Sequence, residues 1–509
     1  MPRAWTVLGM TVFTILIWRL SKIGRRPSNY PPGPPTLPII GNLHQMPKKN
    51  AHLQFQKWAE EYGPVYSLIL GTKVAIVLSS DVAVKDLLDK RSSIYSGRPE
   101  LYMGQEIMSG GYRPLFMLAH GLLNVKVSRS YVPYQDLEVR AMLMGLLESP
   151  TDFLNHIRRY TTSLTTQMAF GYRTPASDDE NLLEMFENFE ELSKLSGSQV
   201  RNPTLPTFTR LTAFVTTLKS GTAKPCCSID LLKAQKELGF SDELACYLSG
   251  SLLQAGSETT AIILIGFFQA MLVFPEVAKE AQAEIDRVCG DRMPDLNDVP
   301  DLPYIRACMK ESMRWMPATA LGTFCLSISD RNVLHSRSGL LTGASRAIHN
   351  DPKRHPDPRR YNPSRWEGDD QNSAQAAVNP DPGKRDHFVF GAGRRLCQGM
   401  HIADRSLFLA ISRTLWAFDL RCPVDEKTGH QIIPDVDNIK DGLFISPMPF
   451  AADIVPRSES RAAAVKKEWA NVAGLLDDDM QWKSVPEGLK WRDYEAHDDG
   501  NEDALESFL

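Results

Sequence analysis

One very long apolar pattern in the middle of the chain limits the fold more than any other feature. Ser241 can cap a helix, and Asp242 and Glu243 suit its first turn. Apolar residues then continue to Phe274, where Pro275 stops the helical pattern. At about 1.5 Å per residue, such a helix is roughly 50 Å long and can cross a whole domain. Because the pattern is apolar nearly all round, the helix is expected to lie buried in a large helical core.

The middle of this predicted helix contains residues that are unusual for a buried helix. The stretch reads AGSETT, residues 255–260. Gly256 costs about 1 kcal/mol relative to alanine inside a helix, and Glu258 is expensive to bury without a partner or a proton. One interpretation is a glycine that allows close packing, next to a partly exposed acid. The other is a notch where a ligand meets the backbone, with Glu258 and Thr259 able to pass protons.

A second stretch, FGAGRRLCQG at residues 390–399, places one cysteine among glycines and arginines. A helical pattern follows over 400–418, so Cys397 lies at a helix N-terminus, where free N–H groups favour an anionic sulfur. A structural cysteine does not need these arginines. A cysteine phosphatase needs an arginine six residues after the cysteine, where this chain has Ala403. The remaining interpretation is a thiolate ligand of a haem, whose macrocycle supplies the four equatorial bonds.

Composition limits the other function classes. The 509 residues are 43% apolar, enough for a large core, and the net charge of -4 comes with an acidic C-terminal stretch, 477–509. The sequence has no dense stripe of Lys and Arg, so a nucleic-acid partner is not expected. The eight cysteines have no C-x-x-C spacing, which argues against zinc ribbons and iron–sulfur sites and favours reduced thiols in the cytosol.

The N-terminus predicts a membrane anchor. Residues 4–20 are almost all apolar and reach the lower limit of about 17–25 residues for a spanning helix. Basic residues follow, which favours a cytoplasmic position for everything downstream. A cleaved signal peptide is the alternative, but no small-residue cleavage site follows the apolar run. The proline-rich stretch that comes next, 27–42, is typical of a semi-rigid spacer.

Two further elements complete the predicted organisation. Residues 65–80 have an apolar β pattern with Gly71 at the turn. A helix over 303–316 carries Glu311 and Arg314 on one face, an arrangement that is most often a surface ion pair. The predicted domains are an anchor with its basic flank (1–26), a hinge (27–42), a catalytic domain (43–460) and an acidic, disordered tail (461–509).

Four motifs resemble those of the cytochrome P-450 superfamily, in family order and over roughly residues 30–460. AGSETT is similar to that family's oxygen-activating helix motif, and ESMR (311–314) to its E-x-x-R helix. NPSRW (362–366) resembles the P-x-R loop that completes the same ion network. FGAGRRLCQG resembles the F-x-x-G-x-R-x-C-x-G cysteine loop. Within the family, the nearest resemblance is to fungal microsomal enzymes of secondary metabolism.

This resemblance implies the fold, the cofactor and a role for each site residue. The fold would be mainly α with a small β region, the P-450 fold, preceded by an N-terminal membrane-anchor helix. Cys397 would be the iron ligand of heme b, and Glu258 and Thr259 would deliver protons. The residues expected at the cofactor are Gly256, which would leave space for dioxygen, Phe390, Gly393, Arg395, which would pair with a propionate, and Gly399. Those expected to form a structural ion triad are Glu311, Arg314 and Arg365.

The implied reaction is the insertion of one oxygen atom from O2 into a small apolar organic molecule. The sequence contains no nucleotide or flavin fingerprint, so electrons would come from a separate NADPH–cytochrome reductase. The enzyme would sit on the endoplasmic reticulum membrane through its single-pass anchor, with the catalytic domain in the cytosol.

Three regions depart from the family pattern. Residues 116–130 and 318–345 lack the expected propionate partners, and residues 168–251 are short for the substrate-recognition helices. Misplaced exon boundaries, or a diverged protein with impaired haem binding, would each explain this. A degenerate, inactive relative and a reductase-independent haem-thiolate isomerase or dehydratase therefore stay open as alternatives. Since the tail is expected to be disordered, deleting residues 477–509 is expected to leave the haem content unchanged.

Overall fold

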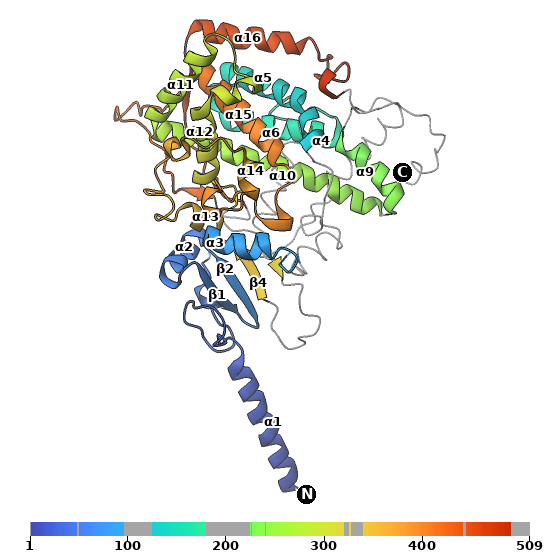
Figure 1. Cartoon of the computed structure of the whole chain (residues 1–509), viewed down its shortest axis with the longest axis vertical. Helices are drawn as coiled ribbons and strands as arrows, with labels where there is room; N and C mark the ends of the chain where they lie inside the picture. Colours follow the sequence, from blue (N-terminus) through green and yellow to red (C-terminus); the bar gives the residue numbers. More distant parts are fainter. Residues whose placement is uncertain are drawn as a thin grey trace. The chain divides into compact units, whose positions relative to one another are not determined.

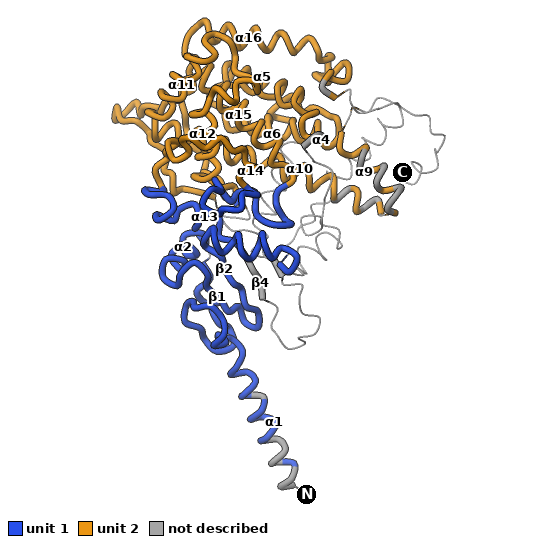
Figure 2. Tube along the Cα trace, in the orientation of Figure 1, with its two compact units in different colours: residues 1–100, 319–358, 377–397 blue, residues 101–318, 359–376, 398–509 orange. Residues whose placement is uncertain are grey.

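The chain folds as two compact units (Figure 2). Unit 1 comprises residues 1–100, 319–358 and 377–397, and unit 2 comprises residues 101–318, 359–376 and 398–509. The catalytic domain predicted over 43–460 includes residues of both units. Within unit 1, strand β4 (Gly339–Gly343) pairs with the N-terminal strand β2 (Lys73–Leu78). The computed structural model describes residues 2–47, 50–95, 125–179, 224, 226–239, 241–319, 325–326, 339–440 and 444–489.

Unit 1 is built on a sheet of strand order β1-β2-β4-β3 (Figure 1). Strand β1 (Val65–Leu70) and β2 form the hairpin that the sequence predicts over 65–80, and Gly71 takes a φ of 64° at the turn. Strand β3 (Cys325–Leu326) pairs antiparallel with β4. The other elements of the unit are α1 (Pro2–Lys22), η1 (Leu43–Gln45), α2 (Ala51–Tyr62), α3 (Asp81–Val84), the π-helical turn η2 (Lys85–Lys90), α13 (Ser345–His349), η8 (Pro382–Lys384) and η9 (Gly393–Arg395).

The proline-rich stretch 27–42 is bound to the sheet, and its role as a spacer remains a prediction. Arg26 donates from Nη1 to the Gly33 carbonyl at 2.8 Å and from Nε to Ser67 Oγ at 2.9 Å. Asn42 donates to the Pro34 carbonyl at 3.1 Å and accepts the Ile69 N–H at 2.8 Å. The carbonyls of Gly33 and Pro34 are thus bound by two side chains that flank the proline-rich run.

Unit 2 is almost entirely helical and is centred on α10 (Asp242–Val273) (Figure 1). Its predicted cap is confirmed, because Ser241 Oγ accepts the Leu244 N–H at 3.4 Å. The stretch Leu248–Val273 is long and apolar enough to cross a membrane, but 78% of its 18-residue apolar window is buried inside the protein, as expected of a core helix. The other helices are α4 (Val125–Ser130), α5 (Val132–Glu148), η5 (Pro150–Asp152), α6 (Phe153–Phe170), α9 (Cys227–Leu238), α11 (Pro275–Cys289), η6 (Leu296–Asp301), α12 (Pro303–Trp315), η7 (Pro363–Trp366), α15 (Met400–Ala417), α16 (Glu459–Ala473) and η10 (Glu487–Leu489).

The remaining elements are small. Helix α14 (Ser373–Val378) spans a unit boundary along the sequence, and two pairs of short strands belong to unit 2. The strand pairs are β5 (Phe418–Arg421) with β8 (Asp453–Pro456), and β6 (Ile439–Lys440) with β7 (Ser446–Pro447). The described residues are thus mainly α with small sheets, as the sequence predicts.

The C-terminal residues up to 489 are folded, so the prediction of disorder from residue 461 is wrong for them. Helix α16 is followed by Leu476, Trp482 and Leu489, which are buried in one apolar cluster with residues of α5 and α6. The ring of Trp482 lies 5.9 Å from that of Tyr134. The acidic residues of this stretch give it a disordered composition, but these three apolar residues all reach the core. Residues 490–509 lie outside the described residues.

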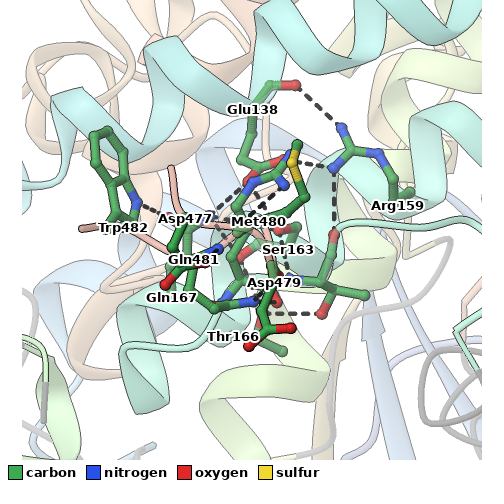
Figure 3. A network of polar contacts seen from close by, with 12 residues as sticks. Glu138, Arg159, Ser163, Thr166, Gln167, Asp477, Asp479, Met480, Gln481 and Trp482 are labelled. Carbon is green, nitrogen blue, oxygen red and sulfur yellow. Dashed lines mark hydrogen bonds and ion pairs between the residues drawn. The ribbon is translucent and has the colours of Figure 1, made fainter. Parts of the chain in front are cut away.

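A buried polar network joins α5, α6 and the C-terminal stretch (Figure 3). The buried carboxylate of Glu138 pairs with Arg159 at 2.6 Å and with Arg173 at 2.7 Å, and it accepts from Gln167 Nε2 at 2.8 Å. Gln167 Oε1 in turn accepts the indole N–H of Trp482 at 2.7 Å. The amide of Gln481 makes two hydrogen bonds to the Arg173 backbone, at 2.8 and 2.9 Å. The two guanidiniums compensate for the cost of burying the carboxylate.

Replacing Glu138 with glutamine is expected to destabilise the protein by about 3–5 kcal/mol at neutral pH, since two buried guanidiniums lose their counter-ion. Burial by itself raises the pKa of Glu138, but Arg173 and Arg159 outweigh it and hold the pKa below its ordinary value of 4.5. The carboxylate therefore contributes stability above pH 4.5 that is lost as the pH falls through its folded pKa. Urea unfolding on both sides of that pH checks this: the slope of stability against pH should be smaller in Glu138→Gln than in the wild type.

Candidate functional site

The cysteine loop is shaped by two glycines in unit 1. Gly391 and Gly393 have φ angles of 75° and 61°, a backbone region that suits glycine. The loop closes on itself, since the Cys397 N–H donates to the Phe390 carbonyl at 2.8 Å and the Leu396 N–H to the Gly393 carbonyl at 3.1 Å. Cys397 itself is exposed. The exposed thiol therefore belongs to the residue at which the loop closes.

Gly393 also meets a constraint from a distant part of the chain. A Cβ built on it would lie 1.9 Å from the carbonyl oxygen of Leu88 in η2, so no other residue fits this conformation. This backbone contact is enough to explain why residue 393 is a glycine, and the explanation needs no cofactor. The predicted contact of Gly393 with the cofactor remains a prediction.

The other predicted residues of the loop region differ in exposure. Phe390 is almost buried, and its ring lies 5.3 Å from the His387 ring in an edge-to-face arrangement. Arg395 is half-buried and Arg394 is exposed. Gly399 is the N-cap residue of α15, and its carbonyl accepts the Ala403 N–H at 2.9 Å. The predicted position of Cys397 just before a helix is therefore confirmed, because α15 begins at Met400, three residues after the cysteine.

The AGSETT stretch lies in the middle of α10, in unit 2. Ala255 is exposed and Thr259 is half-buried, and the Thr259 hydroxyl donates to the Ala255 carbonyl at 2.6 Å. This bond fixes the hydroxyl against the helix backbone one turn away. Glu258 is half-buried on the same helix.

Gly256 faces α6, and the expectation that it leaves space for dioxygen remains a prediction. A Cβ on Gly256 would lie 2.9 Å from Thr165 Oγ1 and 3.0 Å from Thr165 Cγ2. The volume that the missing side chain frees is therefore filled by Thr165. Of the two interpretations of this glycine, the structure supports close packing of two helices.

Replacing Gly256 with alanine is expected to lower the free energy of unfolding by about 1 kcal/mol. Overpacking costs about 1–3 kcal/mol, and the better helix propensity of alanine returns about 1 kcal/mol. Adding Thr165→Ala should relieve the contact, so the double variant should be more stable than the sum of the single changes predicts. Urea unfolding of the four proteins measures this. A rise in stability with Gly256→Ala alone would contradict the packing role.

The predicted ion triad is brought together in unit 2, and two of its members, Glu311 and Arg314, are buried. Arg314 donates to both oxygens of Glu311 at 2.7 and 2.8 Å, and Arg365 Nε lies 3.4 Å from Glu311 Oε1. The alternative of a solvated surface pair is wrong, because neither side chain of the helix pair is exposed. The Asn362 N–H and the Trp366 indole N–H also donate to this carboxylate, at 2.9 and 3.0 Å. These two donors were not predicted, although both lie within the NPSRW stretch.

The residues present fit a haem better than a bare metal ion. Among the described residues, no three His, Cys, Asp or Glu side chains gather to hold a metal. A metal at the exposed Cys397 would therefore have to bring its other ligands with it, as the macrocycle of haem does. Two arginines within the same loop suit the acidic groups of that cofactor. The departures noted at 116–130, 168–251 and 318–345 lie largely outside the described residues.

A family model described as Cytochrome P450 matches residues 31–229 and 216–433. Cytochrome P450 monooxygenase virE of Hypocrea virens is 75% identical over 550 aligned positions, which include 100% of both chains. Cytochrome P450 monooxygenase fogE of Aspergillus ruber is 51% identical, with 94% of this chain and 97% of that one covered. A zebrafish cytochrome P450 structure with abiraterone shares the fold, with a TM-score of 0.68, 22% identity and 81% of this chain and 100% of that one covered.

Proposed function

Because the chain belongs to the cytochrome P450 family, we propose that Cys397 holds the iron of the family's haem b in a monooxygenase. The observation that carries this assignment is the exposed thiol of Cys397 in a glycine-shaped loop directly before α15. The helix N-terminus favours the thiolate, which is the form that binds a metal. The fungal relatives with high identity support a role in fungal secondary metabolism.

When bound, the haem would supply the binding and activation of O2 for inserting one oxygen atom into a small apolar molecule. The half-buried Arg395 would hold an acidic side group of the cofactor, and Phe390 would pack beside it. The Thr259 hydroxyl, oriented by the Ala255 carbonyl, would pass a proton toward the reacting oxygen, with Glu258 as its source. The buried Glu311 network would keep the helix α12 and the NPSRW stretch in fixed register.

An NADPH–cytochrome reductase is the proposed electron donor. Exposed cations of unit 1 that lie near Cys397 in the sequence would attract the reductase to its docking site. Lys384 and Arg394 are both exposed. Reversing one charge with Arg394→Glu is expected to slow reduction by purified reductase about tenfold at low salt, the lower end of electrostatic steering. The difference should shrink as salt rises. Arg421→Glu, at an exposed arginine of β5, serves as the control; equal slowing in both variants would contradict the docking site.

The proposed membrane anchor is α1. Its described large apolar side chains are exposed, among them Trp5, Phe13, Ile17 and Trp18. Such a helix would place the protein on the endoplasmic reticulum membrane, with the rest of the chain in the cytosol. Deleting residues 2–22 should move the protein from the carbonate-washed membrane fraction to the supernatant. Retention in the membrane would contradict a single-pass anchor.

The reduced carbon-monoxide spectrum of the purified full chain tests the proposed function. A spectrum of thiolate-ligated haem is expected. Its absence would favour an inactive relative, an alternative supported by the alignment with virE, which spans 550 positions against the 509 residues of this chain. The virE protein therefore contains stretches that this chain lacks. Product formation without NADPH would instead favour a haem-thiolate isomerase or dehydratase.

A further inference from the structure

An aspartate from the N-terminal part of the chain holds the cysteine loop. Asp89, in the π-helical turn η2, accepts the Gly393 N–H through Oδ1 at 2.6 Å. That N–H opens the turn η9, whose first carbonyl accepts the Leu396 N–H. The Asp89 side chain is only 15% exposed. A charge-assisted hydrogen bond of this length and burial fixes the position of the loop backbone four residues before Cys397.

A buried arginine holds the same loop two residues before Gly393. The guanidinium of Arg385 is 2% exposed and pairs with Asp89 Oδ2 at 3.6 Å. Arg385 Nε donates to the His387 carbonyl at 3.1 Å, and Nη2 donates to the Gly391 carbonyl. Lys85 pairs with the same Asp89 oxygen at 3.2 Å. Since burying one of these charges without the other is costly, the pair is expected to act as a unit.

The contacts together leave the loop little freedom. The Gly391 carbonyl is bound by Arg385 and the Gly393 amide by Asp89, while the Cys397 N–H is bound by the Phe390 carbonyl. The close approach of Leu88 to Gly393 adds a steric limit on the same side. These contacts therefore restrict the backbone that carries Cys397 while the Asp89–Arg385 pair is intact.

We propose that Asp89 and Arg385 are positioning residues that set the geometry of the Cys397 thiolate toward iron. This proposal rests on the proposed function, in which Cys397 is the iron ligand. Partners that orient a metal ligand typically change metal affinity about 10–100-fold when they are removed. Neither residue touches the iron in this proposal, so both act through the loop backbone.

The test uses the full chain and two substitutions of unequal severity. Asp89→Asn keeps an oxygen that can accept the Gly393 N–H but removes the charge that Arg385 needs, whereas Asp89→Ala removes both. Asp89→Ala is expected to lower haem affinity about tenfold, and to convert part of the reduced carbon-monoxide spectrum to a form without thiolate ligation. Asp89→Asn should give a smaller change in the same direction. Asp86→Ala is the matched control, because Asp86 lies in the same turn and makes an exposed pair with Arg91 at 3.4 Å.

The spectral readout separates a positioning role from a structural one. A purely structural role would lower the melting temperature of Asp89→Ala and leave the spectrum of its bound haem like that of the wild type, which would overturn the proposal. Combining Asp89→Ala with Arg385→Gln should add little to the spectral change of either variant, because the pair acts as a unit. If the spectral changes of the two single variants added up in the double variant, Asp89 and Arg385 would not act as a unit.

A second readout distinguishes failure of this proposal from failure of the proposed function. The rate at which iodoacetamide alkylates Cys397, measured by mass spectrometry on the purified chain, reports the loop conformation directly. Asp89→Ala should change this rate and Asp86→Ala should not. If the wild type shows no thiolate-type spectrum, the iron-ligand assignment fails while the alkylation rates still test whether Asp89 holds the loop. Equal alkylation rates in all variants would overturn the proposal that Asp89 holds the cysteine loop in place.

Discussion

Replacing Cys397 with alanine is expected to abolish haem binding and oxidation together while leaving the fold intact. The thiol is exposed, so its removal costs little packing, and the backbone bond from residue 397 to the Phe390 carbonyl is unaffected. Haem affinity should fall by more than about 100-fold, beyond the range seen for partners that merely orient a ligand. The haem absorbance per protein and the reduced carbon-monoxide spectrum measure this, with the melting temperature as the check on folding.

Cys289→Ser is the matched control for this substitution. Burial raises the pKa of the Cys289 thiol to about 11, so it stays protonated at neutral pH and is a poor metal ligand. The serine variant should keep the full haem content of the wild type. If Cys397→Ala retained haem with a thiolate-type spectrum, another cysteine would be the ligand and the proposed site would be wrong.

Local signals in the sequence were enough to predict the central helix and its neighbours. The cap at Ser241 and the stop at Pro275 lie next to the residues they control, and α10 begins and ends within one residue of the predicted limits. The hairpin around Gly71 and the helix α12 follow from equally local patterns. Such features depend on neighbours along the chain, so a periodicity or a capping residue is sufficient to reveal them.

Contacts between distant segments could not be predicted in this way. The Asp89 carboxylate reaches Gly393 across 304 positions, and no local pattern marks η2 as a partner of the cysteine loop. For Gly256, the sequence showed an unusual glycine but not Thr165, the residue that fills the space beside it. The spacing of Glu311 and Arg314 predicted a shared helix face, yet their burial depends on the NPSRW stretch, which only the family resemblance linked to them.

The C-terminal stretch shows how composition alone misleads. Its many acidic residues favour disorder, but only a few apolar residues are needed to hold a short segment against a preformed surface. Trp482 combines a buried ring with an N–H donated to Gln167, and Gln481 satisfies both the N–H and the carbonyl of Arg173. These contacts connect the last described residues to the Glu138 network between α5 and α6 (Figure 3).

Ending the chain at residue 476 is therefore expected to destabilise unit 2 by on the order of 5 kcal/mol and to reduce the yield of folded, haem-containing protein. Loss of the buried Trp482 ring alone corresponds to about 3–5 kcal/mol, and leaving buried partners of Gln481 unpaired adds about 1–3 kcal/mol. This replaces the sequence-based expectation that removing residues 477–509 leaves the haem content unchanged. Thermal unfolding and the haem content of the purified protein are the measurements.

A chain that ends at residue 489 provides the matched control, because it removes most of the acidic residues of the tail but keeps every contact described above. It should unfold at the same temperature as the full chain. Trp482→Phe separates the two kinds of contact, since phenylalanine keeps most of the ring and loses the N–H bound to Gln167, at an expected cost of about 1–3 kcal/mol. If the chain ending at 476 matched the one ending at 489 in melting temperature, the C-terminal stretch would contribute nothing to the stability of α5 and α6.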